Sequence, residues 1–272
     1  MKQAKQILIF DSGVGGLSIF EQITRLNSQV DCLYLFDNAY FPYGELEDDF
    51  LIKRLTELLL AVVEKHAIDL IVIACNSAST VALQVLRAHF TIPIVGVVPA
   101  IKPAAQLTKN GVIGLLATPA TINREYTKLL IDEFAPNLTV LKIGSTALVK
   151  MAEQKLRGIV VDQANLQKIF EPWLTLCEKP DVIVLGCTHF PLLKEEIAGC
   201  FERQVQLVDP GVAVANRVNQ LLGKQTESNS VTGYRAYYTK EYSETEKENL
   251  AALKQNFFDY GFVELCYLNE LL

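Results

Sequence analysis

The chain has 272 residues, of which 50% are hydrophobic and 21% charged, a balance typical of a globular protein with one large domain or two ordinary ones. Its 25 Lys and Arg against 31 Asp and Glu give a formal charge of −6, which disfavours a protein that binds nucleic-acid phosphates. No apolar run is long enough for a membrane span or a signal peptide, and the six cysteines follow neither a disulfide framework nor a metal-finger spacing. We therefore expect a cytoplasmic, reduced protein without nucleic-acid or membrane partners.

Short runs rich in β-branched residues alternate with longer segments of helical period, which predicts an α/β fold with largely parallel sheets. The predicted strands are Ile7–Phe10, Cys32–Phe36, Leu70–Ala74, Ile94–Val97, Val112–Ala117, Val140–Ile143, Val182–Leu185 and Gln206–Val208. The predicted helices are Phe50–Lys65, Ser79–Phe90, Asn123–Phe134 and Leu166–Cys177. The polar segment Lys224–Val231 is expected to be an exposed loop.

An internal repeat suggests that the chain contains two similar halves. Asp69–Cys75 (DLIVIAC) aligns without gaps on Asp181–Cys187 (DVIVLGC), and two weaker matches occur upstream and downstream at nearly the same spacing. Short strand patterns can match by chance, but a series of matches in order favours a duplicated α/β unit. A duplication would place Cys75 and Cys187 at equivalent positions.

Three predicted strands end in polar or reactive residues. The sequence DSGVGG (11–16) follows the first strand, CNSAS (75–79) follows the strand ending at Ala74, and CTHFP (187–191) follows the strand ending at Leu185. In open parallel sheets, ligands bind beyond the carboxyl ends of the strands, where helix N-termini offer free N–H groups. We expect these three segments to face one pocket.

The glycine-rich segment 11–16 leaves two interpretations open. A nucleotide loop is one, but Ser18 stands where a dinucleotide fingerprint has its third glycine, and the Gly-Lys-Ser/Thr of a P-loop is missing. An aspartate at the mouth of the loop would also repel phosphate. The other interpretation is a tight turn from strand to helix that holds no ligand.

Cys75 and Cys187 differ from the other cysteines because each ends a strand beside a helix start. A helix N-terminus stabilises a thiolate, so we expect both thiols to be partly ionised. The remaining cysteines lie among apolar neighbours in the sequence and are interpreted as small buried hydrophobic residues; they are Cys32, Cys177, Cys200 and Cys266.

The ionisable residues near these thiols have less specific patterns. His189 follows Cys187 by two residues and could be its proton partner or a metal ligand. His66 and His89 are expected on helix surfaces. Glu153 lies on a helical segment and, taken by itself, is interpreted as a solvated charge.

Four motifs in order make the chain resemble bacterial glutamate racemases: DSGVGG (11–16), PYG (42–44), ACNSAS (74–79) and GCTHFP (186–191). The resemblance covers about residues 7 to 217. It implies two pseudo-symmetric α/β domains with the active site between them, and a C-terminal segment that returns to the first domain. The implied domains are 1–97 with 211–272, and 98–210. The implied activity is a cofactor-independent interconversion of L- and D-glutamate, which supplies D-glutamate for peptidoglycan.

The same resemblance implies roles for individual residues. Cys75 and Cys187 would be the acid/base pair on opposite faces of the substrate, assisted by Asp11 and His189 respectively, with Glu153 as an auxiliary group. The residues implied to bind substrate are Asp11, Ser12, Tyr43, Gly44, Asn76, Ser77, Thr118, Thr121, Thr188 and His189. Relatives usually have threonine where this chain has Ser77, a change that keeps the hydroxyl group.

Partners are implied by the resemblance as well. We expect glutamate as substrate, a homodimer, no metal or other cofactor, and an activating peptidoglycan precursor as in some relatives. Physical chemistry agrees with two thiols, because racemisation removes a proton from one face of the α-carbon and returns one to the other. The alternatives are aspartate racemisation on the same scaffold, a zinc protein with Cys and His ligands, and a non-catalytic amino-acid-binding module.

Overall fold

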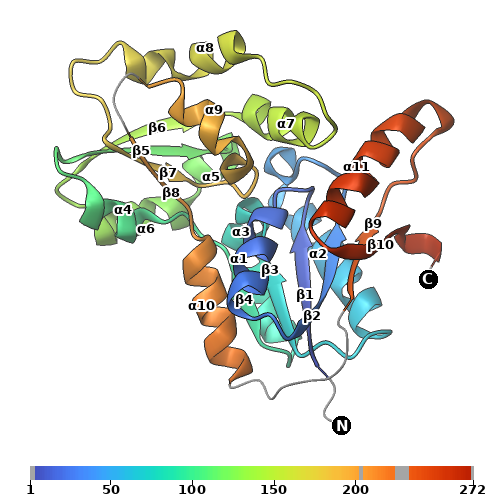
Figure 1. Cartoon of the computed structure of the whole chain (residues 1–272). Helices are drawn as coiled ribbons and strands as arrows, with labels where there is room; N and C mark the ends of the chain where they lie inside the picture. The colour runs from blue at the N-terminus through green and yellow to red at the C-terminus, as the bar shows by residue number, and fades with distance from the viewer. Residues whose placement is uncertain (1–3, 202–204, 224–232, 271–272) are drawn as a thin grey trace.

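The computed structural model describes residues 4–201, 205–223 and 233–270, and within them the strands form two entirely parallel sheets (Figure 1). The first sheet contains β1 (Lys5–Asp11), β2 (Val30–Phe36), β3 (Leu70–Ile73), β4 (Ile94–Gly96), β9 (Tyr234–Tyr238) and β10 (Phe262–Tyr267). The second contains β5 (Val112–Ala117), β6 (Thr139–Gly144), β7 (Val182–Leu185) and β8 (Gln206–Val208). The predicted α/β class and all eight predicted strands are therefore confirmed, whereas β9 and β10 were not predicted.

The two sheets share one strand order. The first runs β10-β9-β2-β1-β3-β4 and the second β6-β5-β7-β8, so β5 to β8 repeat the arrangement of β1 to β4. The sequence repeat relates β3 of the first sheet to β7 of the second, because it aligns the segments in which these two strands lie. The common order supports a duplicated unit rather than a chance match.

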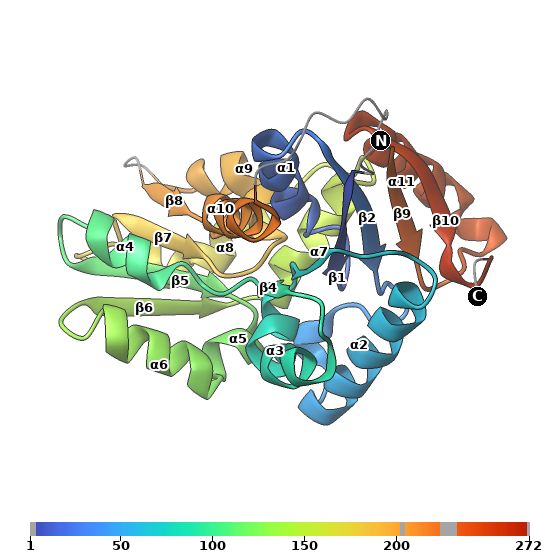
Figure 2. The same ribbon diagram turned by 90° about the horizontal axis from the view of Figure 1, so that it is seen from below.

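Helices cover both faces of each sheet, so central strands such as β3 and β7 are buried on both sides and consist of continuous apolar runs (Figure 2). The helices are α1 (Leu17–Leu26), α2 (Asp48–Val63), α3 (Asn76–His89), α4 (Ile101–Leu107), α5 (Pro119–Asn123), α6 (Glu125–Phe134), α7 (Thr146–Lys155), α8 (Gln163–Leu174), α9 (Lys194–Ala198), α10 (Gly211–Leu222) and α11 (Lys247–Asp259). Short 3-10 turns occupy Tyr43–Glu45, Phe190–Leu193, Glu244–Glu246 and Leu268–Glu270.

Each predicted helix is present, with two informative differences. The one expected from Ser79 begins at Asn76, directly after Cys75. The one expected from Asn123 is divided into α5 and α6 by the extended backbone of Arg124. The segment Lys224–Val231, predicted as a loop, lies outside the described residues. No helix in the described part of the chain is long and apolar enough to cross a membrane.

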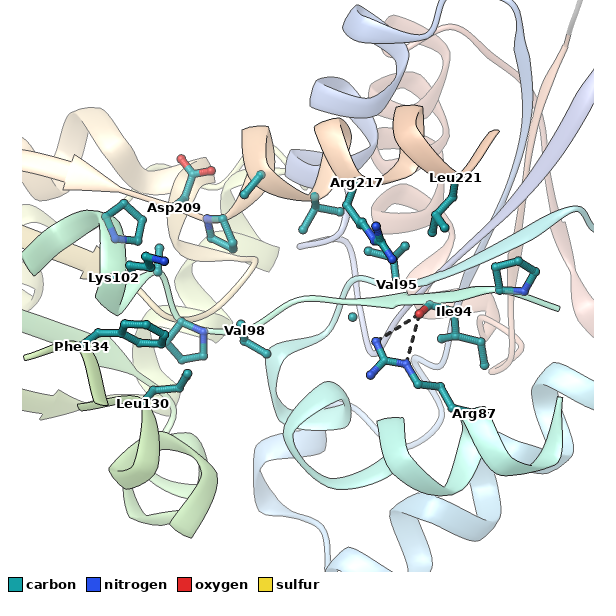
Figure 3. Close-up of a pocket in the computed structure, with 18 of the residues that line it drawn as sticks. Arg87, Ile94, Val95, Val98, Lys102, Leu130, Phe134, Asp209, Arg217 and Leu221 are labelled. Carbon is teal, nitrogen blue, oxygen red and sulfur yellow. Dashed lines mark hydrogen bonds between the residues drawn. The ribbon is translucent and has the colours of Figure 1, made fainter. Parts of the chain in front are cut away.

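The chain passes between the two sheets twice, after β4 and after β8. The second passage leads into α10, which packs against α1 of the first half (Figure 1). A cavity of about 750 Å³ lies at these two links, lined by α3, α4, α6 and α10 (Figure 3). We propose domain boundaries at 97/98 and 210/211, because these are the links between the sheets.

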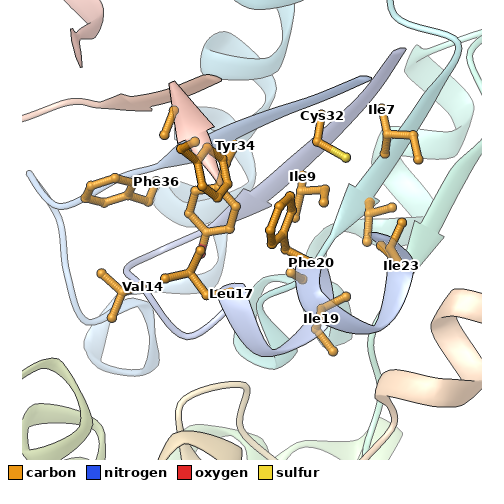
Figure 4. Close-up of a cluster of buried hydrophobic side chains, with 14 of the residues drawn as sticks. Ile7, Ile9, Val14, Leu17, Ile19, Phe20, Ile23, Cys32, Tyr34 and Phe36 are labelled. Carbon is orange, nitrogen blue, oxygen red and sulfur yellow. The ribbon is translucent and has the colours of Figure 1, made fainter. Parts of the chain in front are cut away.

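The packing of β1 shows how the sequence fixes the first half. Ile7 and Ile9 point into a core that α1 covers, whereas Leu8 and Phe10 point into the core under α2 and α3 (Figure 4). Both cores are fully buried along this strand. The rigid strand holds its last residue, Asp11, at the carboxyl edge of the sheet.

Candidate active site

The two cysteines singled out in the sequence occupy equivalent places in the two halves. Cys75 follows β3 and Cys187 follows β7 after one glycine, and in each sheet this strand lies beside the first strand of its half. That is the point where strand order reverses, which is the usual place for a ligand in an open α/β sheet. Both residues are almost buried, with 6% and 7% exposure.

On the Cys75 side, the nearest polar groups come from the end of β1. The Cys75 thiol lies 3.7 Å from the Ser12 hydroxyl. Asp11 is fully buried, and its Oδ1 accepts hydrogen bonds from the Ser12 hydroxyl and the Gly13 N–H, each at 3.2 Å. Burial raises the pKa of Asp11, although His189 and the hydrogen bonds act in the opposite direction.

The expectation that Cys75 is partly ionised is wrong for this state of the protein. Burial, with a smaller contribution from the nearby Asp11 carboxylate, raises the pKa of the Cys75 thiol to about 12, although the Ala78 N–H at the start of α3 acts in the opposite direction. The helix N-terminus therefore acts as expected, but desolvation is the larger effect. Cys75 is protonated here at neutral pH.

On the Cys187 side, a histidine and a glutamate continue from the thiol. His189 Nδ1 lies 3.8 Å from Cys187 Sγ, and His189 Nε2 lies 3.0 Å from Glu153 Oε1. Burial alone would lower the pKa of His189, but the contacts with Cys187 and Glu153 raise it well above its ordinary value. His189 therefore links Cys187 to the Glu153 carboxylate.

Glu153 is not a solvated helix charge, as its position in the sequence suggested. It is 5% exposed and accepts a hydrogen bond at 2.7 Å from the Val14 N–H, in the glycine-rich segment of the other half. Burial raises the pKa of Glu153, but His189, Val14 and Arg157 lower it more. Glu153 therefore remains a carboxylate and joins the two halves.

A second contact between the halves lies beside the thiols. The Thr188 hydroxyl donates a hydrogen bond to Asp11 Oδ2 at 2.8 Å. Thr188 directly follows Cys187, so this bond connects the Cys187 segment to the Asp11 carboxylate near Cys75. Ser18, which replaces a fingerprint glycine, donates to the Thr188 carbonyl at 2.9 Å. The surroundings of Cys75 and of Cys187 are thus connected by hydrogen bonds.

The glycines of segment 11–16 provide space for this site. A Cβ on Gly15 would lie 2.7 Å from two ring carbons of His189, and one on Gly13 would lie 3.0 Å from His189 Nε2. Neither residue has a positive φ, so the requirement is the close approach of His189 and not an unusual backbone conformation. The structure favours the tight strand-to-helix turn over the nucleotide loop, because the second half fills the space in front of it.

The expected substrate-binding hydroxyl groups gather at the N-terminus of α5. Thr118 caps this helix by accepting from the Thr121 N–H at 3.2 Å, and its hydroxyl lies 3.2 Å from the hydroxyl of Ser77. Gly44 lies against Thr118, where a Cβ would be only 3.1 Å from it. This cluster joins the starts of α3 and α5, one from each half.

Asn76 and Tyr43 have contrasting environments. Asn76 is 2% exposed, and neither oxygen nor nitrogen of its amide has a hydrogen-bond partner in the described residues. A buried amide without partners indicates a place for a polar ligand. The Tyr43 hydroxyl instead donates to Asp37 Oδ2 at 2.7 Å.

Three charged residues of this region were not predicted. Asp37 follows β2 and forms a bidentate pair with Arg54; its place after a strand could have indicated it. Arg157 pairs with Glu153, and the spacing of four residues on a helix could have indicated that pair. Arg124 of the second half donates to the Ser77 carbonyl at 2.5 Å and the Thr80 hydroxyl at 2.8 Å, for which the sequence gives no signal.

The remaining cysteines and histidines lie outside the site, and three of them differ from the expectation. Cys32 and Cys200 are buried as expected, but Cys177 is exposed and Cys266 is partly exposed. His89 ends α3 and is exposed, whereas His66 lies past the end of α2 and is partly buried. Among the described residues, no group of three or more His, Cys, Asp and Glu side chains is arranged to hold a metal ion, which gives no support to the zinc alternative.

Comparison with known proteins agrees with this geometry. The Asp/Glu/Hydantoin racemase family matches residues 10–218. The glutamate racemase of Pectobacterium atrosepticum is 53% identical over 216 residues, 79% of this chain and 76% of that protein. The glutamate racemase of Photorhabdus laumondii is 47% identical over 264 residues, 95% of this chain and 89% of that protein.

A solved structure extends the comparison to the fold. Escherichia coli glutamate racemase, in complex with L-glutamate and the activator UDP-MurNAc-ala, has a TM-score of 0.91 and 42% identity, and the match covers 97% of this chain and 98% of that one. The two parallel sheets define an α/β protein whose fold matches that of this racemase. The chain belongs to the Asp/Glu/Hydantoin racemase family, and within it to the glutamate racemases, which are isomerases.

Proposed function

We propose that this chain interconverts L- and D-glutamate by moving protons between the substrate α-carbon and two thiols, Cys75 and Cys187. One observation carries the proposal: each thiol ends the equivalent strand of a duplicated half, and each has its own polar partners. The pair can therefore reach opposite faces of one carbon atom. The D-glutamate formed would serve peptidoglycan synthesis.

The surroundings of the thiols and the family resemblance support a direction for each one. We assign removal of the α-proton of L-glutamate to Cys187, whose Sγ lies 3.8 Å from His189 Nδ1. Cys75, whose pKa is raised to about 12, is suited to donate the proton it carries to the opposite face. The product is D-glutamate, with the proton of the substrate on Cys187 and a thiolate at Cys75. The reverse reaction exchanges the two roles, with the substrate ammonium group offsetting the charge of the Cys75 thiolate.

The remaining predicted residues would bind the substrate and stabilise charge on its α-carboxylate. Asn76 offers an unpaired amide, and Ser77, Thr118 and Thr121 offer hydroxyl groups beside the N-termini of α3 and α5. The roles of Ser12, Tyr43, Gly44, Thr188 and Asp11 in binding are proposed on the family resemblance. Burial of both thiols supports a dry pocket, in which these dipoles act strongly.

The test is the loss of optical rotation from L-glutamate with purified protein, excess chelator and no added cofactor. We expect complete racemisation under these conditions, and a much slower reaction with L-aspartate. Activity that requires added metal or pyridoxal phosphate would contradict the cofactor-independent mechanism. Tight binding of glutamate without loss of rotation would indicate a binding module.

We also propose that a peptidoglycan precursor regulates the chain through the cavity at the links between the halves. The cavity is largely apolar but includes Lys102, Arg217 and Arg87, cations suited to a phosphorylated ligand (Figure 3). The ligand we would test is the activator bound to the Escherichia coli relative, UDP-MurNAc-ala. Addition should raise the racemisation rate, and Arg217→Gln should weaken this response without changing the basal rate. An unchanged rate at saturating ligand would contradict the proposal.

Assembly and location are proposed on the resemblance and composition alone. We propose a homodimer that acts in the cytoplasm, without nucleic-acid or membrane partners. Sedimentation equilibrium of the purified chain should give twice the chain mass of 30.3 kDa. A purely monomeric species at micromolar concentration would contradict the dimer.

A further inference from the structure

Arg157 is a charged residue near Cys187 that pairs with the buried Glu153 carboxylate. It follows the end of α7, one helical turn after Glu153, and its Nη2 lies 3.1 Å from Glu153 Oε2. The Arg157 side chain is 27% exposed and that of Glu153 is 6% exposed, so the pair is largely removed from water. The Asn256 side chain of α11 donates to the Leu156 carbonyl at 2.6 Å and fixes the backbone before Arg157.

Both oxygens of Glu153 are thereby occupied in a fixed arrangement. Oε1 accepts from the Val14 N–H and faces His189 Nε2, while Oε2 faces Arg157. Without Arg157, Oε2 has no cation beside it, and the carboxylate is free to rotate toward other partners. Rotation would weaken the contact between Oε1 and the imidazole of His189, whose Nδ1 makes a long contact of 3.8 Å with Cys187 Sγ.

We propose that Arg157 is a positioning residue for the proton transfer at Cys187, acting through Glu153 and His189. The Cys75 side has different direct partners, Ser12 and the Asp11 carboxylate, which arise from β1. Loss of Arg157 should therefore impair one half of the reaction and spare the other. This inference rests on the two-thiol function proposed above.

The experiment separates the halves by removing one thiol at a time. The Cys75→Ala variant retains Cys187, and the Cys187→Ala variant retains Cys75, so each exchanges the α-proton of one enantiomer in deuterated water. Arg157→Met is added to each of these backgrounds, and Arg157→Lys restores the charge. Lys155→Met is the control, because Lys155 lies two residues earlier and pairs with Glu196 at 2.7 Å instead of with Glu153. Deuterium incorporation is followed by proton NMR.

We expect Arg157→Met to slow L-glutamate exchange by the Cys75→Ala protein at least about tenfold, less than the roughly 100-fold or more of a positioned acid or base, because Arg157 acts through two other residues. Arg157→Lys should recover most of the rate, and Lys155→Met should leave it unchanged. D-glutamate exchange by the Cys187→Ala protein should be unaffected, which also shows that Arg157→Met folds. Equal losses for both enantiomers, or no loss for L-glutamate, would overturn the role of Arg157. The exchange rates of the two parent variants test the two-thiol function separately.

Discussion

The substitution Gly15→Ala tests whether the glycine-rich segment exists to accommodate His189. The added Cβ would lie 2.7 Å from Cγ and from Cε1 of the His189 ring. Carbon atoms in contact are normally about 3.5–4.0 Å apart, so the ring or the loop must shift by about 1 Å. His189 is 1% exposed and packs against Phe41, with ring centroids 5.6 Å apart, so it has little room to move.

The expected cost has two components. Overpacking a buried site of this kind destabilises a protein by about 1–3 kcal/mol. The second component is a loss of racemisation rate. A displacement of about 1 Å at a reacting group can reduce the rate by about 100-fold. His189 Nδ1 is already 3.8 Å from Cys187 Sγ, so an outward shift would break that contact.

Urea denaturation and racemisation kinetics measure these two components. Gly199→Ala is the matched control: it adds the same methyl group at an exposed helix end, with its nearest neighbouring atom, the Glu195 carbonyl oxygen, 3.4 Å away. This control should change the free energy of unfolding by less than about 0.5 kcal/mol and leave kcat unchanged. If Gly15→Ala behaved like the control, the glycine would not be required for the approach of His189.

Three further predictions follow from the same contacts. Arg124→Met should raise the KM for glutamate about tenfold, because Arg124 of one half holds the α3 start of the other, where Ser77 lies; an unchanged KM would contradict this. Iodoacetamide should label the exposed Cys177 before the buried Cys75 and Cys187, with activity retained, as mass spectrometry can check; early labelling of either buried thiol would count against the structure. The folded-state pKa of His189 is raised, so its stabilisation is complete below pH of about 6.5 and is lost as the pH rises through the folded value. The difference in unfolding free energy between the wild type and His189→Gln should therefore shrink as the pH rises above about 6.5, and a difference that grows would refute the assigned charge.

The predicted strands with the strongest signal are those whose residues are buried on both faces. Ile7–Phe10 and Val182–Leu185 are continuous apolar runs because helices cover both sides of each sheet. The two missed strands lie at one edge of the first sheet and mix aromatic with polar residues, as in Phe262–Tyr267, where four residues are buried or partly buried beside exposed Val263 and Glu264. The mixture of aromatic and polar residues in these two strands gives a weaker apolar signal, so the local pattern did not identify them.

The sequence allowed prediction of those candidate site residues that directly follow a strand. Cys75 and Cys187 stand out because each follows an apolar run and precedes a helix start. The burial of Glu153 depends on contacts with Val14, 139 positions away, and with His189, 36 positions away, which no local pattern records. The pKa of Cys75 was misjudged for the same reason, because desolvation depends on the assembled halves and not on the helix start alone.

The division of labour between the two thiols is tested most directly by α-hydrogen exchange in deuterated water. The measurement compares L- and D-glutamate with each single alanine variant. We expect Cys75→Ala to label L-glutamate and leave D-glutamate almost unlabelled, and Cys187→Ala to do the reverse, with racemisation abolished in both. Equal labelling of both enantiomers by either variant, or racemisation near the wild-type rate, would contradict the two-thiol mechanism.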